Sequence, residues 1–225
     1  AQSSYDDTRT LIARWHGRGR GLYAISPRFA ITSTPEQMAA AQSLVAEHPE
    51  CYVQTHLSEN DAEITLSMQL YPDAPDYTGI YQTSNLFLGS GLFDHQRLSQ
   101  HGVRIGVATD IGGGTSFSML RTLDEGYKIL QLRGQRLTPF NSFYMMTLGN
   151  ARALSLEGTI GTIAPGCSAD LVVLDSAATP AMALRMQTAT QLVEELFLLQ
   201  TLGDDRAIAE VYVAGAQAKS TIGGL

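Results

Sequence analysis

A histidine and a glutamate stand three positions apart at the end of a short apolar segment. They are His56 and Glu59, in the string CYVQTHLSEN of residues 51–60. The composition of residues 51–57 is typical of a buried strand that leads directly into both side chains. A neutral imidazole is a good zinc ligand, and a carboxylate that is not a ligand can carry protons beside the metal. The pattern is short, so a core histidine followed by a helix-capping glutamate explains it equally well.

Asp110 ends another apolar segment and is followed by a run of glycines. The string VRIGVATD, residues 103–110, is expected to form a strand, and Gly112 to Gly114 then lead towards a helix. Glycines let the backbone approach a ligand closely, while the carboxylate can bind a metal or accept a proton. A phosphate-binding loop is the rival interpretation, but GK[ST] is absent and an acidic residue would repel phosphate. The simplest alternative makes Asp110 a turn residue only.

Arg28 and Phe29 follow an expected strand over residues 21–26, which Pro27 ends. The pair places a planar cation with five donors beside an aromatic ring. This combination suits a flat heterocycle, because arginine can hydrogen-bond its edge while phenylalanine packs on its face. A surface arginine next to a core phenylalanine is the more common explanation, so the pair is weak evidence by itself.

Strands and helices alternate along the first part of the chain, and together they would position these side chains. Strands are expected over 21–26, 51–57 and 103–110. Helices are expected over 4–16, 34–48, 61–70, 94–102, 118–132 and 138–156. Such alternation predicts an α/β fold with a parallel sheet, in which reactive groups gather at the carboxyl ends of the strands. Arg28, His56 and Asp110 each lie just past an expected strand, which indicates one shared site.

The helix expected over 34–48 has the clearest start signal in the chain. It begins with Thr34-Pro35-Glu36-Gln37, which supplies a capping threonine, a proline in the first turn and a glutamine three residues after the cap. The carboxyl-terminal part differs in character. Short β segments are expected over 161–175 and 207–220, separated by a helical stretch over 182–202. They suit a small β appendage.

Composition excludes several classes of protein. The 225 residues are 44% hydrophobic and 16% charged, which is typical of a globular protein. The net charge of −7 argues against nucleic acid or an anionic membrane as the main partner. No apolar run is long enough to span a membrane, and the first residues show no signal pattern. With two cysteines that do not suggest a disulfide framework, a reducing, cytoplasmic location is expected.

Several longer strings resemble those of a known family. They are THLSEN, SPRFA, TSNLFLGSGLF, ATDIGGGTSFSMLRTLDEGYKILQL and GTIAPGCSADLVVLD. Together they resemble the guanine deaminase branch of the amidohydrolase superfamily, and the resemblance runs from about residue 4 to 213. Only the last string is shared by the wider superfamily, where it belongs to a small β-sandwich beside the barrel.

The resemblance implies a fold and a reaction. The fold is a (β/α)₈ TIM-type barrel, here incomplete, over residues 1–157, with strands of a small β-sandwich and an intervening helix over 158–225. The reaction is the hydrolytic deamination of guanine to xanthine and ammonia by a homodimer. One Zn²⁺ per subunit is implied, with iron as the alternative metal.

The resemblance also implies roles for the residues named above. His56 and Asp110 would be metal ligands, Glu59 the proton shuttle, and Asp110 the group that takes the proton of the attacking water. Arg28 and Phe29 would contact the purine, together with His56 and Glu59. Alternatives are an amidohydrolase that acts on another aromatic heterocycle, or a catalytically incomplete fragment that binds a purine.

The chain departs from the family in two places. Family members have an H-x-H pair on the first barrel strand, and this sequence contains no such pair. They also carry a histidine on the sixth strand, between segments like DYTGIY and TSNLFL, which here are separated only by Gln82. We therefore expect the amino-terminal half and a strand–helix unit near residues 81–83 to be missing relative to the family. Only about three of the eight strands that a closed barrel requires are evident.

Overall fold

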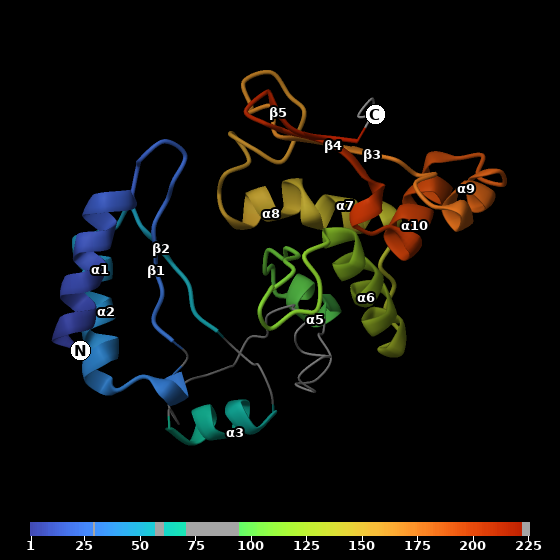
Figure 1. Ribbon diagram of the computed structural model, residues 1–225. Coiled ribbons are helices and arrows are strands. Elements are labelled where there is room, and N and C mark those ends of the chain that lie inside the picture. The colour runs from blue at the N-terminus through green and yellow to red at the C-terminus, as the bar shows by residue number, and fades with distance from the viewer. Residues whose placement is uncertain (29, 57–60, 71–94, 222–225) are drawn as a thin grey trace. The chain divides into compact units, whose positions relative to one another are not determined.

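The computed structural model of the chain describes residues 1–28, 30–56, 61–70 and 95–221. These residues belong to two compact units, Ala1–Ile80 and Tyr81–Leu225, each of which is described by itself (Figure 1). Two of the predicted site residues, Phe29 and Glu59, lie outside the described residues. The same holds for the positions near 81–83, where a strand–helix unit is expected to be missing.

The amino-terminal unit is built on two parallel strands joined by a helix. Its elements are α1 (Gln2–Trp15), β1 (Ala24–Ile25), η1 (Ala30–Thr32), α2 (Pro35–Glu47), β2 (Tyr52–Val53) and α3 (Asp61–Leu70). β1 and β2 pair in parallel, with Ile25 opposite Val53. The side chains of Ile12, Ile25 and Leu44, from α1, β1 and α2, form the core of this unit. The β–α–β part of the predicted α/β arrangement is therefore confirmed.

Within the described part of the chain, three helices begin with the dipeptide Thr-Pro. They are α2, α7 (Pro139–Met146) and α9 (Pro180–Met186). In each, the threonine hydroxyl accepts a hydrogen bond from a backbone N–H of the first turn, and proline occupies a position whose N–H would have no helical partner. In α2, the Gln37 side chain also accepts the Thr34 N–H at 2.9 Å. The helix start predicted at Thr34 is confirmed as a full capping box.

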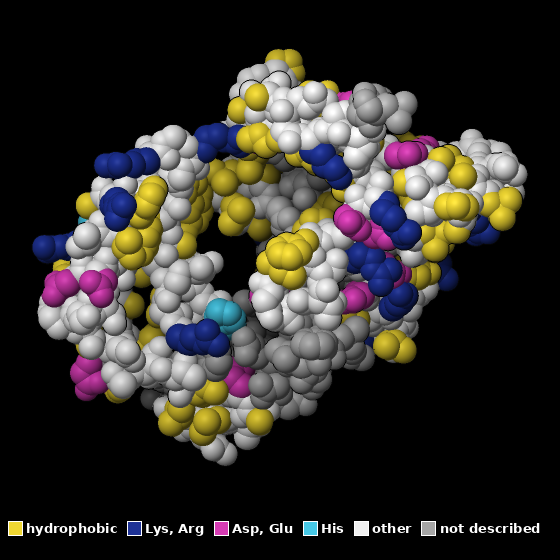
Figure 2. Space-filling model, viewed as in Figure 1, with side chains coloured by type: hydrophobic (Ala, Val, Ile, Leu, Met, Phe, Trp, Pro, Cys, Tyr) yellow, Lys and Arg dark blue, Asp and Glu magenta, His cyan; other side chains and the backbone are white. Residues whose placement is uncertain are grey.

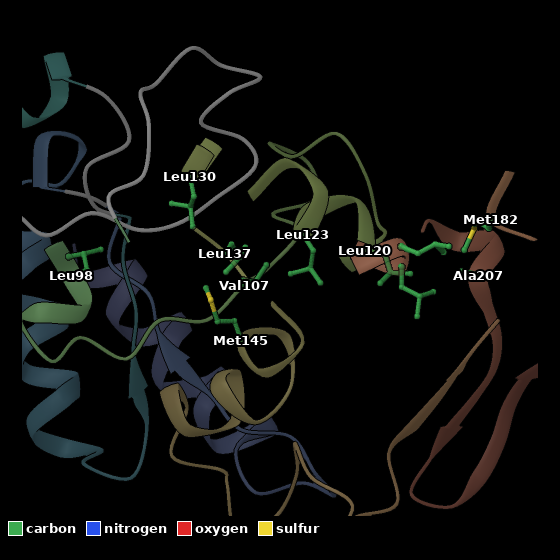
Figure 3. Close-up of a cluster of buried hydrophobic side chains, with 11 residues drawn as sticks. Leu98, Val107, Leu120, Leu123, Leu130, Leu137, Met145, Met182 and Ala207 are labelled. Carbon is green, nitrogen blue, oxygen red and sulfur yellow. The ribbon is translucent and has the colours of Figure 1, made fainter. Parts of the chain in front are cut away.

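Helices dominate the carboxyl-terminal unit. Besides α7 and α9 they are α5 (His95–Gln100), α6 (Met119–Leu132), α8 (Leu148–Ala153), α10 (Leu192–Leu202) and η2 (Asp205–Ala207). The core gathers Leu120, Leu123 and Leu130 of α6 with Val107 and Met145 (Figure 3). Among the described residues, no helix has both the length and the apolar character that a membrane crossing requires.

The carboxyl-terminal part of the chain also contains an antiparallel sheet. Its strands are β3 (Leu171–Leu174), β4 (Ile208–Val213) and β5 (Ala216–Ser220), in the order β3-β4-β5. β4 and β5 are joined by Ala214 and Gly215, which both have positive φ, as a two-residue hairpin turn requires. Within the described residues, β3 is paired on one side only, and Val172 and Val173 of this strand are exposed. The predicted β segments of this region are confirmed at 171–174 and 208–220.

The structure corrects three predictions about secondary structure. Residues 103–110, expected to be a strand, have no regular secondary structure and pair with no strand among the described residues. The helix expected over 138–156 is two helices, α7 and α8, because Thr147 leaves the helical conformation (φ −123°, ψ −102°). The helical stretch expected over 182–202 is likewise divided between α9 and α10.

The fold class is confirmed at the level of a mixed α/β protein. The described residues contain one two-stranded and one three-stranded sheet, and no closed barrel. A complete (β/α)₈ barrel stays a prediction for a protein with additional strands. The two units divide near residue 80, and the predicted boundary between 1–157 and 158–225 also stays a prediction.

Large apolar side chains reach the surface in both units (Figure 2). Phe117 and Ile163 are 83% and 88% exposed in the carboxyl-terminal unit, and Trp15 is 51% exposed in the amino-terminal unit. Isolated exposed apolar residues are normal, but a large exposed apolar area is typical of surfaces that pack against other protein segments.

Candidate active-site residues

The carboxyl ends of β1 and β2 are held together by three hydrogen bonds. The Tyr52 N–H donates to the Tyr23 carbonyl and the Gln54 N–H to the Ile25 carbonyl, each at 3.0 Å. Beyond the last paired residues, the Gln54 side chain donates to the Ser26 hydroxyl at 2.9 Å. Because β1 and β2 are parallel, both strands end at the same edge of the sheet. Arg28 and His56 therefore follow the ends of two neighbouring strands.

Arg28 borders a cavity of about 190 Å³ in the amino-terminal unit. Its side chain is exposed, and its backbone carbonyl accepts a hydrogen bond from the Ser33 hydroxyl at 3.0 Å. The Tyr5 phenol also lines the cavity and donates to the Glu47 carboxylate at 2.6 Å. This hydrogen bond raises the pKa of Tyr5, so the phenol stays neutral. Arg28 therefore brings the positive charge to a cavity that hydroxyl groups also line.

His56 is half-buried past the end of β2. At the start of that strand, the Cys51 thiol lies 3.7 Å from His16 Nδ1. Burial, with a smaller contribution from the charge of Glu50, raises the pKa of Cys51. The raised pKa disfavours the thiolate, which is the form that binds metals. The imidazole of His56 is therefore the better candidate ligand on this strand.

Asp110 adopts a left-handed backbone conformation, with φ of 48°. Its carbonyl oxygen accepts hydrogen bonds from the N–H groups of Gly113 (3.0 Å) and Gly114 (2.5 Å). Gly112, inside the turn, has φ of 114°, which L-residues with a side chain rarely adopt. Among the residues that the structure describes, none donates a hydrogen bond to the half-buried Asp110 carboxylate. The glycine run therefore folds back on the Asp110 backbone and leaves its carboxylate for other partners.

Asn150 is a residue near the candidate site that sequence reasoning missed. Its side-chain amide pairs with the backbone of Val107, three residues before Asp110: Oδ1 accepts the Val107 N–H at 2.9 Å, and Nδ2 donates to the Val107 carbonyl at 2.8 Å. The signal in the sequence was an asparagine inside an expected helix and a glycine, Gly106, inside an expected strand.

The structure brings some of the predicted residues together. Arg28 and His56 follow adjacent strands of one unit, whereas Asp110 lies in the other unit. No group of three or more His, Cys, Asp or Glu that could hold a metal ion occurs among residues 1–28, 30–56, 61–70 and 95–221. Glu59 and Phe29 stand outside these residues, so their assigned roles stay predictions.

Comparison with known proteins identifies the family. Residues 72–218, more than half of the chain, match the Amidohydrolase family. The chain belongs to the amidohydrolase family. Guanine deaminase of Escherichia coli strain K12 is 45% identical to this amidohydrolase over 251 residues, which cover 96% of the chain and 57% of that protein. The chain thus spans little more than half the length of this relative. Since the aligned stretch is longer than the chain's 225 residues, the relative contains internal residues without a counterpart here.

Solved amidohydrolase structures resemble the described fold closely. E. coli guanine deaminase superposes with a TM-score of 0.92 at 44% identity, covering 97% of this chain and 60% of that one. Guanine deaminase from Bradyrhizobium japonicum gives a TM-score of 0.85 at 32% identity, covering 97% and 61%. A zinc-bound adenosine deaminase from Xanthomonas campestris gives 0.81 at 19% identity, covering 96% and 56%, a likeness of fold alone. The fold of this amidohydrolase therefore matches a large part of each of these structures.

Proposed function

We propose that this chain carries part of the active site of a guanine deaminase, which hydrolyses guanine to xanthine and ammonia. The observation that carries the proposal is the 45% identity with E. coli guanine deaminase across 96% of the chain. The arrangement of Arg28 and His56 at adjacent strand ends supports it, because parallel α/β proteins place their reactive groups there.

The donor types of His56 and Asp110 fit zinc, which binds imidazole nitrogen and carboxylate oxygen. The described residues contain no group of three ligands, so these two side chains need further ligands from elsewhere. We propose His56 and Asp110 as two ligands of such a shared site, with iron as the alternative metal. When bound, zinc supplies acidity, because it lowers the pKa of a water at the site towards about 7.

Protons are moved by two carboxylates in this proposal. The Asp110 carboxylate accepts the proton of the water as its oxygen attacks the amino-bearing carbon of guanine. Glu59 donates a proton to the adjacent ring nitrogen. It then takes the proton of the hydroxyl group now attached to the ring carbon and passes it to the amino group, which leaves as neutral ammonia while the ring carbonyl forms. Neutral ammonia is a far better leaving group than amide ion, so proton delivery contributes directly to the rate. The water oxygen remains on the ring, and the product is xanthine.

Guanine is held by the residues after β1. The Arg28 guanidinium can donate hydrogen bonds to the acceptor edge of the purine, and the Phe29 ring can pack on its face. The cavity beside Arg28 leaves its exposed side chain room to reach a ligand. This part of the proposal explains selection of a flat, hydrogen-bonding heterocycle.

A chimera tests the function directly. This chain replaces the aligned region of E. coli guanine deaminase, and every segment of the relative without a counterpart here is kept. We expect the zinc-loaded chimera to convert guanine to xanthine, followed by the change in ultraviolet absorbance. Adenosine and a hydroxylated triazine serve as competing substrates. A folded, zinc-loaded chimera that turns over one of these and leaves guanine unchanged would contradict the proposal.

The main alternative is a fragment that binds a purine without catalysis. The lack of three grouped ligands among the described residues favours it for the chain alone. Titration of the 225-residue chain with guanine, together with an assay for xanthine, separates the two possibilities. Binding without turnover by the chain, combined with an inactive chimera, would establish the alternative.

A further inference from the structure

The segment that carries Asp110 lacks the neighbours that a strand would have. Residues 103–110 belong to no sheet of the described structure, yet Val107 in their middle is 1% exposed and packs in the core with Leu123 and Met145 (Figure 3). A buried peptide group must find hydrogen-bond partners, since an unpaired one is costly. The partners of the Val107 peptide groups therefore indicate what fixes this segment.

Asn150 supplies both partners. Its Oδ1 accepts the Val107 N–H at 2.9 Å and its Nδ2 donates to the Val107 carbonyl at 2.8 Å. A neighbouring parallel strand would satisfy the same residue in the same way, with one acceptor and one donor. Asparagine is an unfavourable residue within a helix, and Asn150 lies within α8. Its two bonds to Val107 give a physical reason for its presence there.

Gly106 makes room for the Asn150 amide. A Cβ atom built on Gly106 would overlap Asn150 Oδ1, whereas the φ of Gly106 is not in the positive range. Space, and not backbone conformation, is therefore what this glycine provides. We call the pairing of Asn150 with Val107, together with the space at Gly106, the Asn150 clamp.

A third hydrogen bond to the same helix holds the start of the segment. Arg104 Nη1 donates to the Arg152 carbonyl, at the end of α8, at 2.7 Å. Beyond the clamp, the Asp110 carbonyl is held by Gly113 and Gly114. Asp110 therefore lies between Val107, which Asn150 holds, and the turn formed by Gly113 and Gly114. Its backbone has a left-handed conformation, which is maintained only where the surrounding structure imposes it.

We infer that the Asn150 clamp positions Asp110, so that Asn150 and Gly106 are positioning residues for the Asp110 carboxylate. The inference rests on the proposed function for its catalytic consequence, but its structural part concerns only this chain. Loss of the clamp releases Val107 and removes the upstream anchor. The Asp110 backbone then loses its fixed conformation, and the carboxylate points in more than one direction.

Amide hydrogen exchange of the 225-residue chain, resolved by NMR, tests the structural part. The variants are Asn150→Ala and Gly106→Ala, which remove the clamp from opposite sides. Matched controls are Asn141→Ala, an exposed asparagine of α7, and Gly158→Ala, a glycine with open space around its Cβ position. We expect exchange at Val107, Gly113 and Gly114 to become about tenfold faster in both clamp variants and to stay unchanged in the controls.

The double variant Asn150→Ala with Gly106→Ala should exchange no faster than either single variant, because both remove the same pair of bonds. Should Asn150→Ala fail to fold, Gly106→Ala and Asn150→Asp, which keeps one acceptor oxygen, decide the question. Unchanged protection of Gly113 and Gly114 in a variant that has lost protection at Val107 would overturn the inference, because the clamp would then not reach Asp110.

Steady-state kinetics in the chimera test the catalytic consequence. We expect Asn150→Ala and Gly106→Ala to lower kcat by about 10- to 100-fold, the effect typical of losing a group that orients a ligand, and to leave KM nearly unchanged. A rise in KM at constant kcat would contradict positioning of Asp110. A wild-type chimera that is inactive on guanine would refute the proposed function, and the exchange experiment would still decide the clamp.

Discussion

The predicted roles of His56 and Glu59 can be separated because a ligand and a proton carrier fail in different ways. Removal of a metal ligand lowers metal content, whereas removal of an acid–base group lowers the rate at full metal content. His56 lies past the end of β2, and Glu59 follows outside the described residues. Substitution is therefore the direct way to assign both.

In the chimera, His56→Ala should lower zinc content and Glu59→Gln should not. Alanine removes a ligand nitrogen, while glutamine preserves the shape of a residue that holds no metal. Glu59→Gln should still reduce kcat by roughly 10²- to 10⁴-fold, because proton delivery to the ring nitrogen and the amine is lost. Metal analysis and steady-state rates are measured on the same samples. A metal-free Glu59→Gln protein would make Glu59 a ligand, and two fully active variants would reduce residues 51–60 to a strand and a capped helix.

Arg28→Ala in the chimera should lower kcat/KM for guanine by about 10- to 150-fold. This is the rate equivalent of roughly 1.5–3 kcal/mol for a charge-assisted hydrogen bond. Arg18→Ala, at another exposed arginine of the same unit, is the matched control. If both variants behave like the wild type, Arg28 is a surface residue without a role in binding.

At the scale of secondary-structure elements, the start of α2 and the parallel pairing of β1 with β2 were predicted correctly, whereas the surroundings of residues 103–110 were not. Thr34-Pro35 predicts the start of α2, because the capping threonine and the proline both stabilise the first turn of the helix itself. The parallel pairing of β1 with β2 could be predicted because a helix, α2, connects the two strands. Residues 103–110 have the composition of a strand, but a strand also requires a neighbouring strand to pair with, and the described residues supply none. Val107 pairs instead with the side chain of Asn150, 43 positions along the sequence.

The active-site prediction has the same limit. The ends of β1 and β2, which precede Arg28 and His56, could be located from composition, whereas the strand expected before Asp110 is absent from the described residues. The division between α7 and α8 at Thr147 was not predicted, because the composition of residues 138–156 is that of one continuous helix. Asn150 follows that division, and its pairing with Val107 depends on a contact between distant segments that composition does not reveal.

The capping box of α2 should contribute measurably to stability. Thr34→Ala removes the hydroxyl that accepts the Gln37 N–H, and we expect the free energy of unfolding to fall by about 0.5–2 kcal/mol. Thr34→Ser keeps the cap and should lie close to the wild type. Urea denaturation followed by circular dichroism measures both. Equal losses for the two variants would mean that the methyl group of Thr34, and not its hydroxyl, stabilises the helix.

For the whole molecule, the proposed zinc site is the property that most depends on ligands beyond the described residues. The chain alone should hold well under one zinc ion per molecule after dialysis, since a stable site needs three or four grouped ligands. The chimera should hold about one, and light scattering on the same sample tests the expected homodimer. Stoichiometric zinc in the chain alone, lost on His56→Ala, would show that the ligands outside the described residues complete the site.

β3, at one edge of the antiparallel sheet, affects whether the chain aggregates in concentrated solution. β3 has the uncharged sequence Leu171-Val-Val-Leu174. One edge of this strand pairs with β4, and its other edge has no partner strand among the described residues. Such an edge is a template on which a second copy can add its own strand, and repeated addition leads to fibrous aggregates.

Two exposed carboxylates, Asp170 and Asp175, flank the four apolar residues of β3. They act as gatekeepers, since copies that align their edges would bring like charges together. Salt screens that repulsion, so turbidity should develop faster at high ionic strength and faster still in Asp175→Asn. Asp7→Asn, the same charge change on the exposed surface of α1 in the amino-terminal unit, should aggregate at the wild-type rate. Solubility of this chain would then depend on two charges that have no part in its chemistry.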